Sequence, residues 1–164
     1  MDLSQLLKDR KESGDGALPE AEEDFRFPLD DLAPQIVTEG GAVTKCDESN
    51  FPALAGNDAA VYLLTLKPGG LREPHWHPNA WELDYCVSGN GRLGVVTPES
   101  TESIVVLGPG DVGFIPQGWG HFVENVGTAD LKCVVVFNHS KPNTIGLSKF
   151  IDSVPSSMFT EPLV

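Results

Sequence analysis

Three of the four histidines in this sequence, together with one glutamate, have the residue types and spacing of a metal site. His75 and His77 are separated by one residue, Glu82 comes shortly after them, and His121 lies much later in the chain. Three imidazoles and one carboxylate form a mixed nitrogen and oxygen ligand set, which suits a divalent first-row metal and lacks the thiolates expected of a structural zinc site. On a six-coordinate ion they would leave positions open for water or substrate, as a catalytic centre requires.

The local sequence predicts how these side chains could reach one cavity. Alternate residues of an extended strand point to the same face, so His75 and His77 would face the same way and Trp76 the other way. The strand is broken at Pro78-Asn79. A turn there would place Glu82, at the start of the next strand, beside the two imidazoles.

The sequence around these residues is typical of an all-β domain. Apolar runs rich in Val, Ile, Leu, Tyr and Phe are separated by Pro, Gly, Asn and Asp roughly every eight to twelve residues. The predicted strands are Gln35–Thr38, Ala42–Cys46, Ala59–Leu66, Leu71–Trp76, Glu82–Val87, Arg92–Thr97, Ser103–Leu107, Val112–Ile115, His121–Asn125 and Leu131–Asn138. Glycine- and proline-containing joints between them predict tight hairpins. A single antiparallel jelly roll is the expected architecture.

The two ends of the chain differ from this pattern. Residues 1–24 combine a short amphipathic patch with an acidic tract, which predicts a short helix and a flexible arm. Residues 25–155 form the one predicted domain, and residues 156–164 form a C-terminal tail. Within the domain, apolar residues at helical spacing predict a short outer helix at Leu147–Val154.

Charge and cysteine content narrow the possible partners and compartment. The net charge of −13 disfavours nucleic acids and anionic membrane surfaces. The three cysteines are an odd number without a C-x-x-C pair, which argues against a disulfide framework and makes a reducing cytosol the default expectation. The N-terminus has no basic start and apolar run of a signal peptide, although a processed chain would share this feature, and no stretch approaches the length of a bilayer span.

Ten residues at fixed spacing link this sequence to a known family. They are Gly69, His75, His77, Glu82, Gly89, Gly110, Pro116, Gly118, His121 and Asn125. They fill all the signature positions of both motifs of the cupin superfamily, which this sequence therefore closely resembles. The resemblance implies a cupin double-stranded β-helix, a jelly-roll barrel that holds one metal through His75, His77, Glu82 and His121.

Within the cupins, the sequence around the motifs is similar to that of the oxalate decarboxylase group, whose members bind manganese. Those decarboxylases carry two cupin domains in one chain, and this single domain resembles their C-terminal half more closely. They also place a proton-transferring glutamate in a Ser-Glu-Asn lid after the last core strand. The corresponding stretch here, residues 138–146, contains no carboxylate. The resemblance therefore predicts weak decarboxylase activity and favours oxidase-like chemistry or binding alone.

The resemblance also implies that Arg72 faces the carboxylate of the substrate. Simple alternation would put Arg72 on the face opposite His75, so a turn or a β-bulge must redirect it. Its planar guanidinium could then bind a carboxylate through two hydrogen bonds beside the metal. A surface salt bridge is the alternative interpretation.

Three functional hypotheses follow. The first is a manganese-dependent enzyme that acts on oxalate or another small carboxylate, by decarboxylase or oxidase chemistry. The second is a non-catalytic cupin that binds metal and ligand for sensing or storage, and the third is a cupin dioxygenase or sugar isomerase. The ligand types also permit iron, nickel, copper, cobalt or zinc. Family analogy predicts a homodimer or a larger homo-oligomer.

Overall fold

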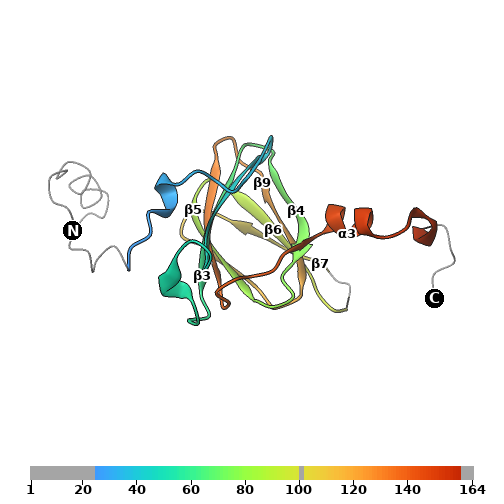
Figure 1. Cartoon of the computed structure of the whole chain (residues 1–164). Coiled ribbons are helices and arrows are strands. Elements are labelled where there is room, and N and C mark those ends of the chain that lie inside the picture. The colour runs from blue at the N-terminus through green and yellow to red at the C-terminus, as the bar shows by residue number, and fades with distance from the viewer. Residues whose placement is uncertain (1–24, 100–101, 160–164) are drawn as a thin grey trace.

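The structure is a computed structural model that describes residues 25–99 and 102–159, and they form two antiparallel sheets (Figure 1). The strands are β1 (Ile36–Thr38), β2 (Gly41–Cys46), β3 (Ala60–Leu66), β4 (Leu71–Trp76), β5 (Glu82–Ser88), β6 (Gly91–Val96), β7 (Glu102–Leu107), β8 (Val112–Ile115), β9 (Gly120–Asn125), β10 (Leu131–Phe137) and β11 (Ile145–Gly146). One sheet has the order β1-β2-β3-β10-β5-β8, and the other has the order β11-β4-β9-β6-β7. The predicted all-β jelly roll is confirmed.

Alternation along the strands builds the core between the sheets. In β3 and β10 every second residue is buried, and these residues include Tyr62, Leu64, Cys133 and Val135. Buried residues of β6 and β9 on the second sheet, among them Leu93 and Val123, join the same core cluster. The apolar runs of the sequence therefore supply the two inner faces of one barrel.

The strands predicted from the sequence agree with those observed, and each end differs by no more than one residue. The strand that the sequence pattern did not predict is β11, which is only two residues long and pairs with β4 opposite His75 and Trp76. A two-residue strand is too short to show an alternating pattern. Its pairing nevertheless brings the segment after β10 back to the strand that carries His75.

One turn connects the first group of motif residues, which contains His77, to the second group, which contains His121. Gly118, between β8 and β9, has a φ of 79°, a left-handed conformation that favours glycine. Its amide donates a hydrogen bond to the carbonyl oxygen of His77, at 2.9 Å. The turn that leads to His121 is thus bonded to the backbone of another candidate ligand.

Short helical segments flank the barrel. They are η1 (Leu29–Asp31), η2 (Pro52–Leu54), α3 (Leu147–Ser153) and η3 (Ser156–Phe159). The helix α3 lies where the sequence predicts one and projects from the side of β4, while η1 lies near β3 on the other sheet (Figure 1). The helix predicted within residues 1–24 falls outside the described residues. Among the described residues, no helix is both long and apolar enough to cross a membrane.

Candidate metal centre

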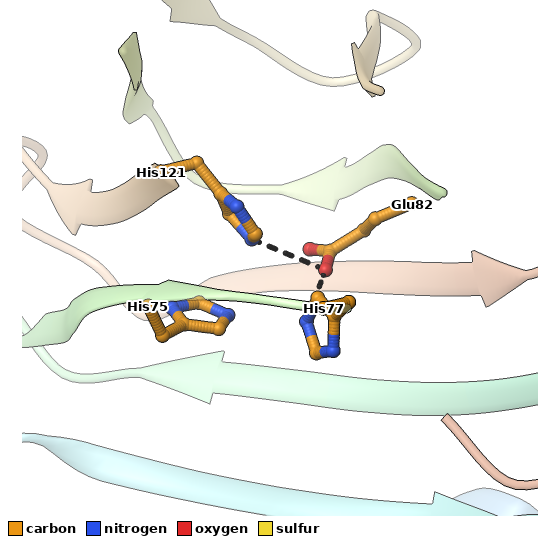
Figure 2. A group of neighbouring side chains, drawn as sticks. All are labelled: His75, His77, Glu82 and His121. Atoms are coloured by element: carbon orange, nitrogen blue, oxygen red, sulfur yellow. Dashed lines mark hydrogen bonds and ion pairs between the residues drawn. The ribbon is translucent and has the colours of Figure 1, made fainter. Parts of the chain in front are cut away.

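The four residues of the predicted ligand set meet inside the barrel. His75 is on β4 and pairs directly with His121 on β9, His77 follows the end of β4, and Glu82 is the first residue of β5. All four are buried, and one potential ligand atom from each lies within 4.8 Å of the others. Figure 2 shows His77 and His121 directed at the Glu82 carboxylate, with His75 beside them. The structure thus brings together residues that are up to 46 positions apart in the chain.

Hydrogen bonds to the main chain orient all three imidazoles in the same way. The Nδ1 atoms of His75, His77 and His121 lie 2.7, 2.6 and 3.1 Å from the carbonyl oxygens of Glu73, Asn143 and Trp119, respectively. A carbonyl oxygen only accepts, so each Nδ1 atom must donate. In a neutral imidazole, each Nε2 atom then carries a free lone pair.

The Glu82 carboxylate faces two of these Nε2 atoms at short range. Its Oε2 atom lies 2.8 Å from Nε2 of His77 and 3.2 Å from Nε2 of His121. Burial raises the pKa of Glu82, but protons shared with His121 and His77 in hydrogen bonds outweigh burial and hold the pKa well below its usual range. The carboxylate is therefore anionic within the site.

His75 is the remaining member of the donor set, and its surroundings keep its imidazole neutral. Burial, followed by the charges of His121 and Arg72, lowers the pKa of His75 from 6.5 to about 2. This imidazole is neutral at physiological pH, with its Nε2 lone pair available. Lone pairs and a carboxylate gathered at such distances repel one another unless a proton or a cation lies between them. The donor set therefore fits a divalent cation, and the nitrogen and oxygen ligands match those of first-row metals.

A β-bulge turns Arg72 toward the same cavity. Opposite β9, Arg72 pairs with Val123 and His75 pairs with His121, so three steps along β4 match two along β9. Pro74 lies within this irregularity, where the missing amide hydrogen is tolerated. The extra residue reverses the alternation, and Arg72 lines the cavity together with His75. Burial lowers the pKa of the Arg72 guanidinium, while the carboxylates of Glu82 and Glu73 oppose the shift.

The cavity itself has a volume of about 220 Å³. Besides Arg72 and three of the four clustered residues, apolar barrel residues and a few polar side chains line it. The lining includes Ile36, Val43, Lys45, Tyr62, Leu64, Glu73, Val123, Val135, Phe137, Thr144, Gly146 and Lys149. Thus the candidate metal centre adjoins a largely apolar chamber with cationic side chains.

Asp84 neighbours the site through Glu82, and the sequence analysis did not single it out. It is fully buried and lies two residues after Glu82, on the same face of β5. Neither of its carboxyl oxygens has a hydrogen-bond partner in the described part of the chain. Burial, and then the negative charge of Glu82, raise the pKa of Asp84 well above its usual range. Alternation along β5 predicts its inward direction, but not the absence of a partner.

Asn125, the last motif residue, and His139, the fourth histidine, do not belong to the ligand cluster. The Asn125 side chain donates to the carbonyl oxygens of Leu66 and Ala129, both at 2.8 Å, and accepts from the amide of Gly127. His139 accepts a hydrogen bond from the amide of Lys141 and does not line the cavity. Asn125 therefore holds a turn, and the fourth histidine is outside the candidate site.

These observations define a class of protein: a small antiparallel β-barrel with a buried cluster of three histidines and one glutamate. Residues 27–162 match the family model described as Cupin. The chain therefore belongs to the cupin family, and the resemblance inferred from its motifs is confirmed.

Curated relatives include oxalate decarboxylases and germin-like proteins. Oxalate decarboxylase OxdC of Bacillus subtilis is 33% identical over 133 residues, covering 81% of this chain and 34% of that protein. A probable oxalate decarboxylase of Arthroderma benhamiae is 33% identical, covering 90% of this chain and 36% of that protein. Germin-like protein subfamily T member 3 of Arabidopsis thaliana is 28% identical, covering 87% and 63%.

Solved structures agree with this family assignment. Oxalate decarboxylase from Bacillus subtilis at pH 4.6 superposes with a TM-score of 0.77 and 32% identity, covering 82% of this chain and 34% of that one. A second oxalate decarboxylase structure, which concerns substrate binding and a switch in reaction specificity, gives the same TM-score at 29% identity. The chain thus spans about a third of the length of the decarboxylases that it matches.

Proposed function

We propose that this protein is a metal-dependent enzyme that acts on oxalate or a similar small carboxylate. The observation that carries the proposal is the presence of a half-buried cation, Arg72, in the same cavity as His75, His77 and Glu82. A carboxylate that enters this cavity would meet the Arg72 guanidinium. The planar guanidinium can donate two parallel hydrogen bonds to the two carboxylate oxygens, and the opposite charges of the two groups attract each other. The relatives named as oxalate decarboxylases support oxalate as the first candidate.

The resident metal that we propose is manganese, held by His75, His77, Glu82 and His121. The nitrogen and oxygen ligands suit this ion, and iron, nickel, copper, cobalt or zinc are the alternatives. When bound, the metal would supply Lewis-acid and one-electron redox chemistry. The chain's own contribution is to fix the imidazoles through their Nδ1 atoms, to hold the substrate carboxylate at Arg72 and to keep bulk water out of a largely apolar chamber.

The segment after β10 bears on which reaction follows. Residues 138–146 contain no carboxylate, and Thr144 and Gly146 are the residues of this segment that line the cavity. Decarboxylation of hydrogen oxalate to carbon dioxide and formate requires a proton to reach carbon. Oxidation of oxalic acid by dioxygen gives two molecules of carbon dioxide and hydrogen peroxide and needs no such donor. We therefore propose that oxidase-type turnover predominates over decarboxylation.

The same segment favours a second candidate function. A cupin that holds metal and carboxylate without turnover, for sensing or storage, needs the ligands and Arg72 but no proton donor. It predicts bound metal and a carboxylate-dependent rise in melting temperature, without product. A dioxygenase or isomerase that uses the same metal ligands is the third candidate.

A direct assay separates these candidates. The manganese-loaded protein is incubated with oxalate under dioxygen, and formate, carbon dioxide and hydrogen peroxide are measured against the His75→Ala variant. Peroxide with carbon dioxide, at levels well above those of the variant, is the expected result. If no product exceeds the level of the variant, the oxalate assignment is wrong. Ligand-induced stabilisation without product would favour the binding protein.

We also propose that the protein forms a homodimer or a larger homo-oligomer, and the outer face of the sheet that contains β3, β10, β5 and β8 supports this. Apolar residues occupy two rows across these four strands. The rows are Leu63, Val134, Tyr85 and Val112, and Val61, Val136, Leu83 and Phe114. A second copy packed through a twofold axis would cover both rows with the same residues. Sedimentation at the 17.6 kDa of one chain would contradict this proposal.

Two further proposals concern location and other partners. All three cysteines are buried and unpaired, which supports a reducing compartment, and we propose the cytosol. The net charge of −13 supports a protein that binds neither nucleic acid nor anionic membranes.

A further inference from the structure

The cavity of the candidate metal centre concentrates positive charge in an otherwise acidic protein. Acidic residues number 24 and basic residues 11, yet three of the basic ones, Lys45, Arg72 and Lys149, line this one cavity. They come from β2, β4 and α3. Within residues 25–99 and 102–159, none of the three forms a salt bridge, whereas Arg92 and Lys132 do. These three cations outnumber the two carboxylates, Glu73 and Glu82, that line the same chamber, and this excess of positive charge favours an anionic ligand.

These cations lie at two different levels. Arg72 lines the cavity together with His75, His77 and Glu82, which puts the guanidinium beside the candidate metal centre. The ammonium group of Lys45 lies 5.4 Å from the centre of the Tyr62 ring. The Tyr62 ring is 4.9 Å from that of Phe137, which is itself 4.9 Å from the His77 ring. Lys45 is thus linked to His77 of the ligand cluster through the successive rings of Tyr62 and Phe137.

Lys149 belongs to the outer level as well. It is an exposed residue of α3, the helix that follows β11 along the cavity rim. The helix is attached next to it: the hydroxyl and amide of Ser148 both donate to the carboxylate of Glu73 on β4. These hydrogen bonds lower the pKa of Glu73, so this carboxylate is satisfied within the protein. The charge of Lys149 therefore remains available to a ligand.

The wall between the two levels is apolar. It is formed by residues of β2, β3, β9 and β10, namely Val43, Leu64, Val123, Val135 and Phe137. A ligand that spans the chamber would therefore place an uncharged, apolar segment against this wall, because polar groups there would lose their hydration without gaining partners.

We propose that the preferred ligand is a dicarboxylate in which a short apolar segment separates the two carboxylates. One carboxylate binds at the metal centre and Arg72, and the other binds Lys45 and Lys149. This inference rests on the proposed function, since it assumes that a carboxylate binds beside the metal. Oxalate, whose two carboxylates are directly bonded, would occupy the inner level and leave both lysines unused.

Isothermal titration calorimetry tests this on the manganese-loaded protein without dioxygen, which removes the oxidant of the proposed oxidase-type turnover. The probes are oxalate, glutarate and adipate, with pentanoate and hexanoate as monocarboxylates of matched length. We expect glutarate or adipate to bind at least tenfold more tightly than its matched monocarboxylate. Equal affinity within both matched pairs would overturn the inference.

Variants assign the preference to the two lysines. In Lys45→Ala/Lys149→Ala, the affinity for the long dicarboxylates should fall about tenfold, while the affinity for oxalate and the monocarboxylates stays within twofold. Lys67→Ala removes an exposed lysine outside the cavity and should change none of these values. Equal losses for oxalate and the long dicarboxylates, or an equal effect of Lys67→Ala, would contradict the inference. Unchanged metal content and melting temperature verify that each variant is folded.

The outcomes for this inference and for the proposed function are distinguishable. If oxalate is turned over but the long dicarboxylates gain nothing from the lysines, the inference alone is wrong. If glutarate or adipate binds in a lysine-dependent way but oxalate yields no product, the oxalate assignment is wrong and the inference stands.

Discussion

The imidazole of His77 donates from Nδ1 to the main-chain carbonyl of Asn143, 66 residues later in the chain, at 2.6 Å. The segment between β10 and α3 therefore orients a candidate metal ligand. Asn79 holds this segment in place, because its side chain accepts from the amide of Asn143 at 2.8 Å and donates to the carbonyl of Lys141 at 3.2 Å.

Loss of the Asn79 side chain should weaken metal binding without removing a ligand. In Asn79→Ala, residues 141–143 lose two hydrogen bonds, and the acceptor for His77 becomes less well positioned. We expect the Kd for manganese to rise by about tenfold, the lower end of the range for residues that orient metal ligands. Competition with a fluorescent chelator measures this. Asn57→Ala, which removes two side-chain hydrogen bonds in an exposed turn, is the control and should leave Kd unchanged.

Direct loss of a ligand should abolish metal-dependent stabilisation. Manganese at 100 times its Kd should stabilise the native protein by about 2.7 kcal/mol, because it binds the folded state alone. In His75→Ala and His121→Ala this increment should disappear, and elemental analysis should find little bound metal. A variant that keeps full metal content after either substitution would contradict the proposed ligand set.

Substitution of Arg72 should affect the carboxylate and not the metal. In Arg72→Ala, metal content should stay as in the wild type, while the Kd for oxalate rises at least tenfold, the loss of about 1.4 kcal/mol expected when a charge-assisted hydrogen-bond pair is removed. Arg72→Lys should recover only part of this affinity, since an ammonium lacks the planar arrangement of donors. Equal oxalate affinity in all three proteins would place Arg72 outside the binding site.

Much of this site could be predicted from the sequence, because the determining signals are local. His75 and His77 share a face through strand alternation, and turn residues predict where β4 ends and β5 begins. The position of Arg72 followed less directly: alternation alone predicts the wrong face, and the bulge between Arg72 and His75 corrects it. Pro74 lies within that bulge and is a local signal for it, although the expectation of a bulge did not rest on Pro74.

Other features could not be predicted, because they depend on contacts between distant segments. Nothing near Asn143 in the sequence indicates that its carbonyl meets His77. Lys45 and Lys149 are more than a hundred residues apart, and only the closed barrel brings them to one cavity. The inward direction of Asp84 follows from alternation, but its lack of a partner depends on packing from both sheets.

Asp84 should make stability depend on pH in a characteristic direction. Because its pKa is raised in the folded state, the folded protein keeps a proton that the unfolded chain releases above about pH 4. This contribution to stability is lost as the pH rises through the raised pKa. The side chain introduced by Asp84→Asn has a similar volume and does not titrate. The free energy of unfolding of this variant minus that of the wild type should therefore increase from pH 4 to pH 8. Urea unfolding of the metal-free proteins measures the difference, and a constant difference would contradict the expectation.

The buried thiols should be unreactive in the native protein. Burial, assisted by the charge of Asp47, raises the pKa of Cys46 from 9.0 to about 11, and burial also raises the pKa of Cys86 and Cys133. At pH 8 we expect a disulfide reagent such as dithionitrobenzoate to modify the native protein at least tenfold more slowly than the unfolded chain, in which all three thiols react. Rapid modification of one thiol in the native protein would show that it is more accessible than its burial indicates.

The carbonyl acceptors of Glu73, Asn143 and Trp119 have an evolutionary consequence. Main-chain oxygens are present whichever amino acid occupies a position. Mutation at these three sites can therefore change the side chains around the chamber without removing the acceptors that orient the imidazoles. New ligand preferences can therefore arise through neighbouring side chains while the inner coordination geometry is inherited intact.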